Sequence, residues 1–137
     1  MRLWHYSLIR FLPKSQLLAQ WRELNSIFKK QNKHILINYI YDHDKDYLKS
    51  YTWTVLDEMK RRNIKVRSLD NMIKYFGDNA FVGEVLFYPE HNDRYLYQCV
   101  LNLQEKYDRG QKDFTDDVYR NLCDFIYNYT DKLSNII

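Results

Sequence analysis

The stretch Gln16-Leu17-Leu18-Ala19-Gln20-Trp21-Arg22-Glu23-Leu24 decides the fold of this chain. Within it Leu17, Trp21 and Leu24, continued by Phe28, repeat at i, i+4, i+7 and i+11. This is the spacing of one face of an α-helix. Pro13 disfavours helical geometry at the residue before it, so the helix is expected to open near Lys14 or Ser15. The chain therefore starts its folded body with an amphipathic helix.

A polar stripe runs beside this apolar one. Gln16, Gln20 and Glu23 share one side of the predicted helix, and Arg22 lies one step further round. We expect the polar stripe to form the floor of a site. An adjacent Arg-Glu pair on an amphipathic helix is most often a solvated surface pair, so these residues alone do not make Glu23 catalytic.

A second helix is predicted from its terminal signals. Asp42, Asp44 and Asp46 supply the N-cap and first-turn acids, and the helix runs to Lys60-Arg61-Arg62 with Asn63 in the C′ position. Basic residues in a last turn complement the helix dipole, which is a simpler interpretation than a phosphate clamp. A shorter helical turn is expected from 69 to 75, ending at Gly77.

Two more helices follow from the same apolar spacing. One is expected from about Asn92 to Asp108 and stops near Gly110. The other opens at Thr115, and its first turn carries two aspartates. Residues 1–13 are expected to be extended, 31–41 could be a short strand or a tight connection, and the apolar run 81–88 leads to Pro89 as a loop.

Composition agrees with a helical body. The 137 residues include only three glycines and two prolines, and 17% of them are aromatic. This length suits one domain that buries a core without disulfides or a structural metal. We predict an all-α (mainly α) fold, with residues 1–137 forming a single domain: a small irregular bundle of about four helices with an extended N-terminal segment.

Charge and cysteine content set further expectations. With 21 basic and 18 acidic residues the net charge is +3, which permits nucleic-acid binding without demanding it. Cys99 and Cys123 lack Cys-x-x-Cys spacing, so a reduced, buried pair is expected. No apolar run reaches the roughly 18 residues of a membrane span, nor does the N-terminus resemble a signal peptide. A cytoplasmic protein without a membrane partner is predicted.

A metal site is not expected. The run Asp42-His43-Asp44-Lys45-Asp46 lacks the Gly and Glu that an EF-hand needs at its sixth and twelfth positions, where Tyr47 and Trp53 stand instead. The four histidines, His5, His34, His43 and His91, show no zinc-ligand spacing. The acidic run is thus interpreted as a helix cap.

Several of these residues together resemble a known family. Trp21-Arg22-Glu23-Leu24 occurs in order with Leu17, Ala19, Phe28 and Lys33-His34, and Tyr47 to Arg62 and Leu103 to Lys106 look like later helices of the same family. On these residues the chain resembles the endonuclease V-like family of pyrimidine-dimer DNA glycosylases/AP lyases. The resemblance covers roughly the first half of the chain and one later patch.

The resemblance implies a DNA repair enzyme that removes the 5′ base of a cyclobutane pyrimidine dimer and then nicks the abasic site. In that family the α-amine of the first residue is the nucleophile, and the carboxylate matching Glu23 is the central acid/base. The chain would act as a monomer on damaged double-stranded DNA, with no cofactor. The DNA-binding residues that it implies are Arg2, Gln16, Arg22, Lys33, His34 and Lys106.

The chain also departs from the family. Arg2 is too bulky for the usual removal of the first methionine, so Met1 itself is expected to carry the amine. Ser26 and Asn102 replace basic residues, and a helix from Thr115 replaces the family's aromatic C-terminal strand. An α-amine with a pKa near 8 is unprotonated in about a tenth of molecules at pH 7, far more than an ordinary lysine, which suits imine chemistry.

Two other classes of function remain open. A non-catalytic DNA-binding helical module would use the basic and aromatic residues but would need neither a free amino terminus nor Glu23. A cytoplasmic interaction protein would need none of these groups.

Overall fold

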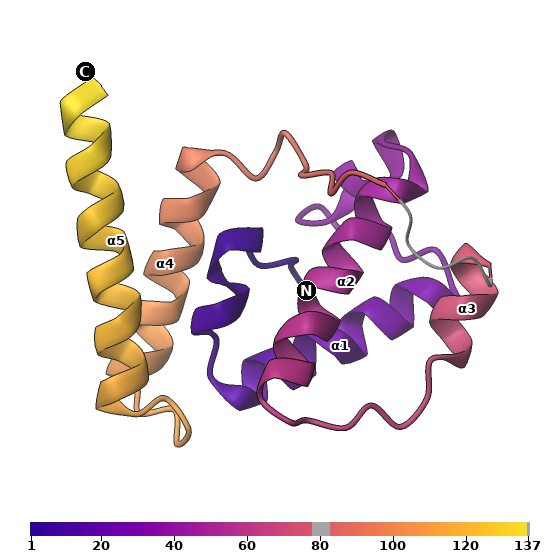
Figure 1. Cartoon of the computed structure of the whole chain (residues 1–137), viewed down its shortest axis with the longest axis horizontal. Coiled ribbons are helices and arrows are strands. Elements are labelled where there is room, and N and C mark those ends of the chain that lie inside the picture. The colour runs from indigo at the N-terminus through magenta and orange to yellow at the C-terminus, as the bar shows by residue number, and fades with distance from the viewer. Residues whose placement is uncertain (78–82, 137) are drawn as a thin grey trace.

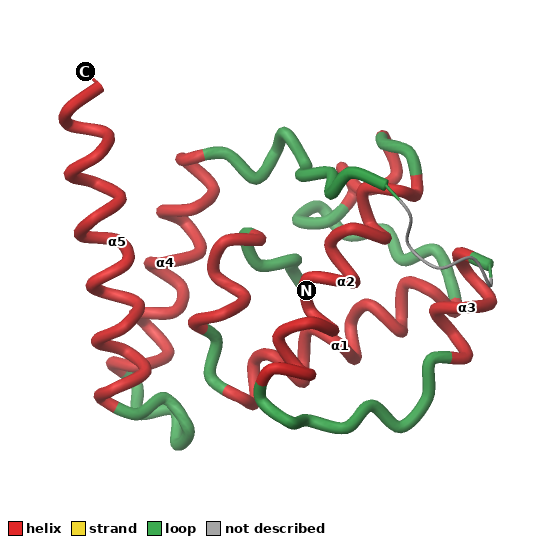
Figure 2. The backbone as a smooth tube through the Cα atoms, in the orientation of Figure 1, coloured by secondary structure: helices red, strands yellow, loops and turns green. Residues whose placement is uncertain are grey.

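The structure, a computed structural model, describes the backbone of residues 1–77 and 83–136 and the side chains of 1–77 and 83–130. Within these residues the chain is helical and contains no strand (Figure 1, Figure 2). The mainly α fold is therefore confirmed. The elements are η1 (Tyr6–Phe11), α1 (Lys14–Lys29), η2 (Asn38–Asp42), α2 (Lys45–Arg61), α3 (Asp70–Phe76), α4 (Asp93–Asp108) and α5 (Asp116–Ile136), where η denotes a 3-10 helix.

The helices begin and end at the predicted signals. The Asp44 side chain accepts a hydrogen bond from the Asp46 amide at 3.0 Å at the start of α2. Beyond the other end of α2, Asn63 adopts a positive φ of 60°, as a C′ residue does. Gly77 ends α3 with a φ of 94°, and the Asn92 side chain caps α4. Local capping chemistry thus sets the lengths of these helices.

The structure overturns one prediction for the non-helical segments and decides between two alternatives for another. Residues 6–11 of the segment expected to be extended form η1, where the His5 ring accepts a hydrogen bond from the Ser7 amide. Of the two alternatives for residues 31–41, the strand does not form: residues 35–37 make a turn and Asn38–Asp42 form η2, so this part of the chain is a tight connection. Asp42 consequently ends η2 and does not cap α2. Of the run 81–88, residues 83–88 are a loop, and 81 and 82 lie outside the described residues.

The hydrophobic core is built around the amino-terminal segment of the chain. Figure 1 shows the first dozen residues lying between α2 and α4, with α1 beneath them and α5 at the outer edge. Leu3, Leu8 and Leu12 of this segment are completely buried, as are Leu17 and Leu24 of α1. Burying a leucine side chain contributes about 1.5–3 kcal/mol, so the amino terminus is an integral part of the core.

The two cysteines differ in burial. Both are free thiols, but only Cys99 is buried, whereas Cys123 is half-buried. The expected burial is correct for Cys99 alone, because Cys123 lies on α5, the helix at the edge of the molecule (Figure 1). No helix in the described parts of the chain combines the length and apolar character needed to cross a bilayer.

Candidate active site at the amino terminus

Gln20 connects the start of the chain to Glu23. Its side chain is buried on α1, and its Oε1 accepts hydrogen bonds from the Trp4 amide and the Tyr51 hydroxyl, each at 2.8 Å. Its Nε2 donates to the Arg2 carbonyl at 3.2 Å and to Glu23 Oε2 at 3.1 Å. Two donors on one side and two acceptors on the other fix the orientation of the amide. Gln20 therefore holds the amino-terminal segment and Glu23 in one arrangement.

Side chains from α2, α4 and the loop before α4 hold the remaining polar groups of this segment. Extended residues make no hydrogen bonds among themselves, so buried backbone groups need other partners. The Tyr95 hydroxyl donates to the Leu3 carbonyl, and the Tyr6 amide donates to His91 Nδ1 at 3.1 Å. The Tyr51 hydroxyl also lies 2.7 Å from the Trp4 carbonyl. The amino terminus is thus positioned by side chains in place of a sheet.

Glu23 lies in the electrostatic field of the amino terminus. Burial raises the pKa of the half-buried Glu23 carboxyl, and the α-amino group of the chain is the largest of the influences that oppose this rise. The Arg2 backbone, Gln20 and Arg22 act in the same direction as the amine. The Arg2 backbone, one residue from that amine, hydrogen-bonds the carboxyl, so Glu23 lies beside the first residues of the chain.

This pair can perform acid–base and nucleophilic chemistry. The Met1 side chain is 39% exposed, so the first residue is open to a substrate. A carboxyl with a raised pKa holds its proton more readily, so it can donate a proton in one step and, once ionised, accept one in the next. Beside it, an α-amine is the most easily deprotonated aliphatic amine of a protein. The predicted residues Met1 and Glu23 are brought together.

The two predicted arginines differ in their surroundings. The half-buried Arg2 guanidinium lies 5.8 Å from the centre of the Trp4 ring and 6.0 Å from that of Tyr95, and one of its nitrogens is 3.9 Å from Cys99 Sγ. Arg2 thus contributes its backbone to the Glu23 site and packs its side chain on α4. Arg22 is exposed, and its side chain makes no ion pair within the described residues.

Gln16 and Lys106 lie at the corner where α1 begins and α4 ends. Gln16 Nε2 donates to Gln111 Oε1 at 3.1 Å, and the Gln111 amide donates to the Lys106 carbonyl at 3.1 Å. Only Gln20 and Glu23 of the predicted polar stripe are hydrogen-bonded to each other, because the loop after α4 provides a partner for Gln16 one helical turn earlier. Gln16 therefore lines a different surface from Glu23.

Lys33 and His34 follow the other end of α1. Both are exposed. His34 organises the chain there, because its amide donates to Asn38 Oδ1 at 2.7 Å and its Nδ1 accepts from the Leu36 amide at 3.1 Å. Neither residue has a hydrogen bond or ion pair with the Glu23 cluster among the residues described.

The residues that fix the amino terminus were not predicted as site residues. The sequence patterns assign no role to Tyr51 or Tyr95, and His91 belongs only to a set of histidines without zinc-ligand spacing. Burial lowers the pKa of His91 to about 3, so the ring is neutral at pH 7. With Nδ1 accepting from Tyr6, the Nε2 hydrogen donates to the Tyr39 hydroxyl at 2.7 Å. The available signal in the sequence is the number of tyrosines, because a buried tyrosine hydroxyl needs a polar partner and could therefore bind the backbone of the amino-terminal segment.

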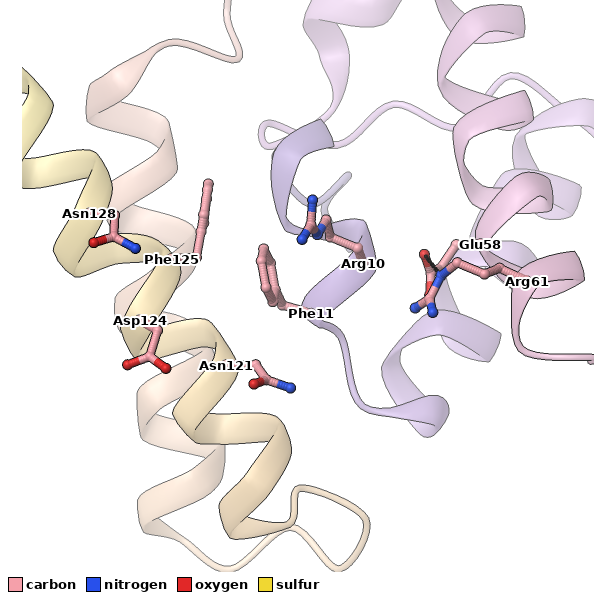
Figure 3. A pocket seen from close by; sticks show the side chains of 8 residues that line it. All are labelled: Arg10, Phe11, Glu58, Arg61, Asn121, Asp124, Phe125 and Asn128. Carbon is pink, nitrogen blue, oxygen red and sulfur yellow. Dashed lines mark hydrogen bonds and ion pairs between the residues drawn. The ribbon is translucent and has the colours of Figure 1, made fainter.

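A pocket of about 720 Å³ lies elsewhere, between η1, α2 and α5 (Figure 3). Phe11 and Phe125 stack across it with ring centres 4.8 Å apart. Its buried acid, Glu58, is engaged by Arg61 and Arg62. Its other lining acid, Asp124, is exposed, and neither a lysine nor the chain terminus lines the pocket, so it offers no acid–amine pair like that of Met1 and Glu23. Across the described residues, no three His, Cys, Asp or Glu side chains are grouped to hold a metal ion.

A comparison with known protein families covers the part of the chain that contains Met1 and Glu23. The family model described as pyrimidine dimer DNA glycosylase matches residues 1–72, which is more than half of the 137 residues. The matched region contains the amino terminus, η1, α1 and α2, and therefore Met1, Gln20, Glu23 and Tyr51. Neither a curated protein nor a solved structure matches the chain significantly.

Proposed function

Because the chain belongs to the pyrimidine dimer DNA glycosylase family, we propose that it excises a damaged pyrimidine base from double-stranded DNA with the α-amine of Met1 and then cleaves the strand as an AP lyase. The observation that supports this mechanism is the amine beside Glu23, with Gln20 bonded both to the carboxyl and to the Arg2 carbonyl. The proposed chemistry uses no metal or organic cofactor.

The first step replaces the base with the amine. The unprotonated nitrogen attacks the sugar C1′, a C1′–N bond to the protein forms, and the bond from C1′ to the base breaks. The departing base carries away the bonding electrons and takes one of the two protons of the attacking nitrogen, so that it leaves as the neutral base and an N–H group remains on C1′. Protonated Glu23 then gives its proton to O4′ as the C1′–O4′ bond breaks, which leaves an open-chain iminium ion.

The second step breaks the strand. The iminium ion makes the C2′ hydrogen acidic, and the Glu23 carboxylate removes it. The C3′–O3′ bond breaks and the 3′ phosphate leaves with the electron pair. Water then hydrolyses the imine and frees the amine. A raised pKa suits Glu23 for both roles, because the group must be an acid in one step and a base in the next.

Borohydride trapping tests the nucleophile. Reduction of the imine on a duplex that contains an abasic site should join protein and DNA covalently, and mass spectrometry should place the adduct on the Met1 nitrogen. Acetylation of the terminus or an uncleaved N-terminal tag should abolish trapping. Efficient trapping of the tagged protein would assign the chemistry to an internal lysine.

The variant Glu23→Gln tests the acid–base role. It should bind DNA at least as well as the wild type, since a negative charge is removed, while strand cleavage falls by about two orders of magnitude or more. Glu105→Gln, a change of the same kind at an exposed glutamate of α4, should leave cleavage intact. Equal cleavage by the two variants would return Glu23 to the role of a surface residue. Binding without any trapping would favour a non-catalytic DNA-binding module.

A further inference from the structure

A second basic site lies where α1 ends, α2 begins and α3 packs against them. It is a pocket of about 370 Å³. Figure 1 shows α3 beside the end of α1, on the opposite side of the molecule from α4 and α5. The pocket is lined by Phe28, Lys29, Lys45, Asn71, Lys74 and Tyr75.

Its three lysines carry positive charge without a lining acid. Lys45 lies over the Tyr75 ring at 4.0 Å from the centroid and donates to the Tyr75 carbonyl at 3.4 Å. Lys29 and Lys74 are exposed and take part in none of the ion pairs of the described chain. The first-turn acids of α2 and α3 do not line the pocket. Exposed ammonium groups gathered in this way attract an anion.

The pocket continues a basic stripe from the candidate active site. Arg22 and Lys29 are seven residues apart on α1, so they lie on one face of the helix about 10 Å apart. Between them Asn25 Oδ1 accepts from Asn71 Nδ2 at 3.1 Å, which ties this face of α1 to α3. The helix that carries Glu23 therefore leads from Arg22 to the three lysines.

We propose that the lysine pocket binds backbone phosphates of the DNA, and that one arm of the duplex runs from Glu23 over Arg22 and Lys29 to α3. This rests on the proposed function, which supplies duplex DNA as the substrate. Lysine ammonium groups bind phosphates as point charges without reading the bases. The distance from Arg22 to Lys29 corresponds to about three base pairs, at 3.4 Å per step. The pocket begins at this distance from Arg22, outside the lesion itself.

The salt dependence of binding tests the pocket without relying on catalysis. The ligand is a duplex with a central tetrahydrofuran residue, an abasic analogue that cannot form an imine. The variant Lys29→Ala/Lys74→Ala should bind it up to about sixtyfold more weakly at 0.1 M salt, and the slope of log K against log salt should shrink by about 1.8 units. Lys60→Ala/Lys65→Ala removes the same charge from exposed positions at the far end of α2 and should change the slope little.

Trimming the duplex tests the direction of the arm. With the analogue about two base pairs from one end or from the other, the wild type should lose more affinity for the duplex that no longer reaches the pocket. The variant Lys29→Ala/Lys74→Ala should lose this difference and keep its response to trimming of the opposite arm. An equal slope for the two double variants, or an equal response of wild type and variant to both trims, would overturn the proposal.

The two proposals fail separately. If Lys29→Ala/Lys74→Ala loses affinity and the wild type is not trapped by borohydride, the phosphate-binding pocket is supported and the proposed amine chemistry is refuted. If the wild type is trapped normally and Lys29→Ala/Lys74→Ala binds DNA with unchanged affinity, the amine chemistry is supported and the phosphate-binding pocket is refuted.

Discussion

Replacing Gln20 with leucine should disconnect the amino terminus from Glu23. The change leaves the buried Trp4 amide without its acceptor, whereas the Tyr51 hydroxyl keeps the Trp4 carbonyl at 2.7 Å. One orphaned buried donor costs about 1–3 kcal/mol of unfolding free energy. The Arg2 carbonyl also loses a donor, but it is only partly buried and can bind water. Urea unfolding at pH 7 should therefore show a loss of about 1–3 kcal/mol.

Catalysis should suffer more than stability. Without Gln20 the amine and the carboxyl are no longer held by a common partner, and a displacement of about 1 Å can cost about a hundredfold in rate. The rate of borohydride trapping measures this loss. The matched control is Gln16→Leu, the same change on the same helix, where the side chain bonds only Gln111. That variant should lose no more than about 1 kcal/mol, and at saturating DNA, where a change in affinity has no effect, it should be trapped like the wild type.

Two results would refute the reasoning. Equal unfolding free energies for Gln20→Leu and Gln16→Leu would mean that the Trp4 amide finds another acceptor. A wild-type trapping rate in Gln20→Leu would mean that the amine reaches the sugar without this support. The variant Gln20→Glu separates the two effects, because it keeps the acceptor for Trp4 and places a second carboxylate against Glu23, which should raise the pKa of Glu23 further.

Two further predictions concern binding and acid stability. Arg22→Ala and Lys106→Ala should each weaken binding to damaged and undamaged duplexes alike and reduce the salt slope by about one unit, whereas Lys60→Ala should not; an unchanged slope in Arg22→Ala would contradict the proposed DNA face. Arg2→Ala should act similarly, with added loss of stability from its packing on α4. His91 has a pKa of about 3 in the fold and about 6.5 when unfolded, so its contribution is complete above pH 6.5 and is lost as the pH falls towards 3, by about 1.4 kcal/mol per unit. Urea unfolding between pH 7 and pH 4 measures this loss, and a flat profile would refute it.

The parts of the fold that local chemistry determines could be predicted from the sequence. The apolar spacing around Gln20 gave α1, the Asp44 cap gave the start of α2, and the positive φ of Asn63 follows from its place after a basic last turn. Each of these signals acts within one or two helical turns. The segment at η2 is ambiguous in the sequence because its two buried residues, Ile37 and Ile40, are too few to define a helical face and do not alternate as the buried residues of a strand do.

The candidate site could be predicted only in part, because its contacts join distant residues. Glu23 and its neighbour Gln20 lie on one predicted stripe, and their hydrogen bond follows from helical spacing. Gln16 belongs to the same stripe but is bonded to Gln111, which is 95 residues away. The bond from Tyr95 to the Leu3 carbonyl spans 92 residues. No periodic pattern in the sequence specifies such a pair.

The groups proposed for the chemistry lie in the first half of the chain, whereas some of the groups that hold them lie in the second half. Met1, Gln20 and Glu23 lie within the matched residues 1–72, whereas Tyr95 and His91, which bind the Leu3 carbonyl and the Tyr6 amide, lie beyond them. An extended segment has no internal hydrogen bonds, so its position depends on these distant partners. The second half of the chain therefore serves the site by fixing the backbone on which the amine is placed, even though it supplies none of the proposed reacting groups.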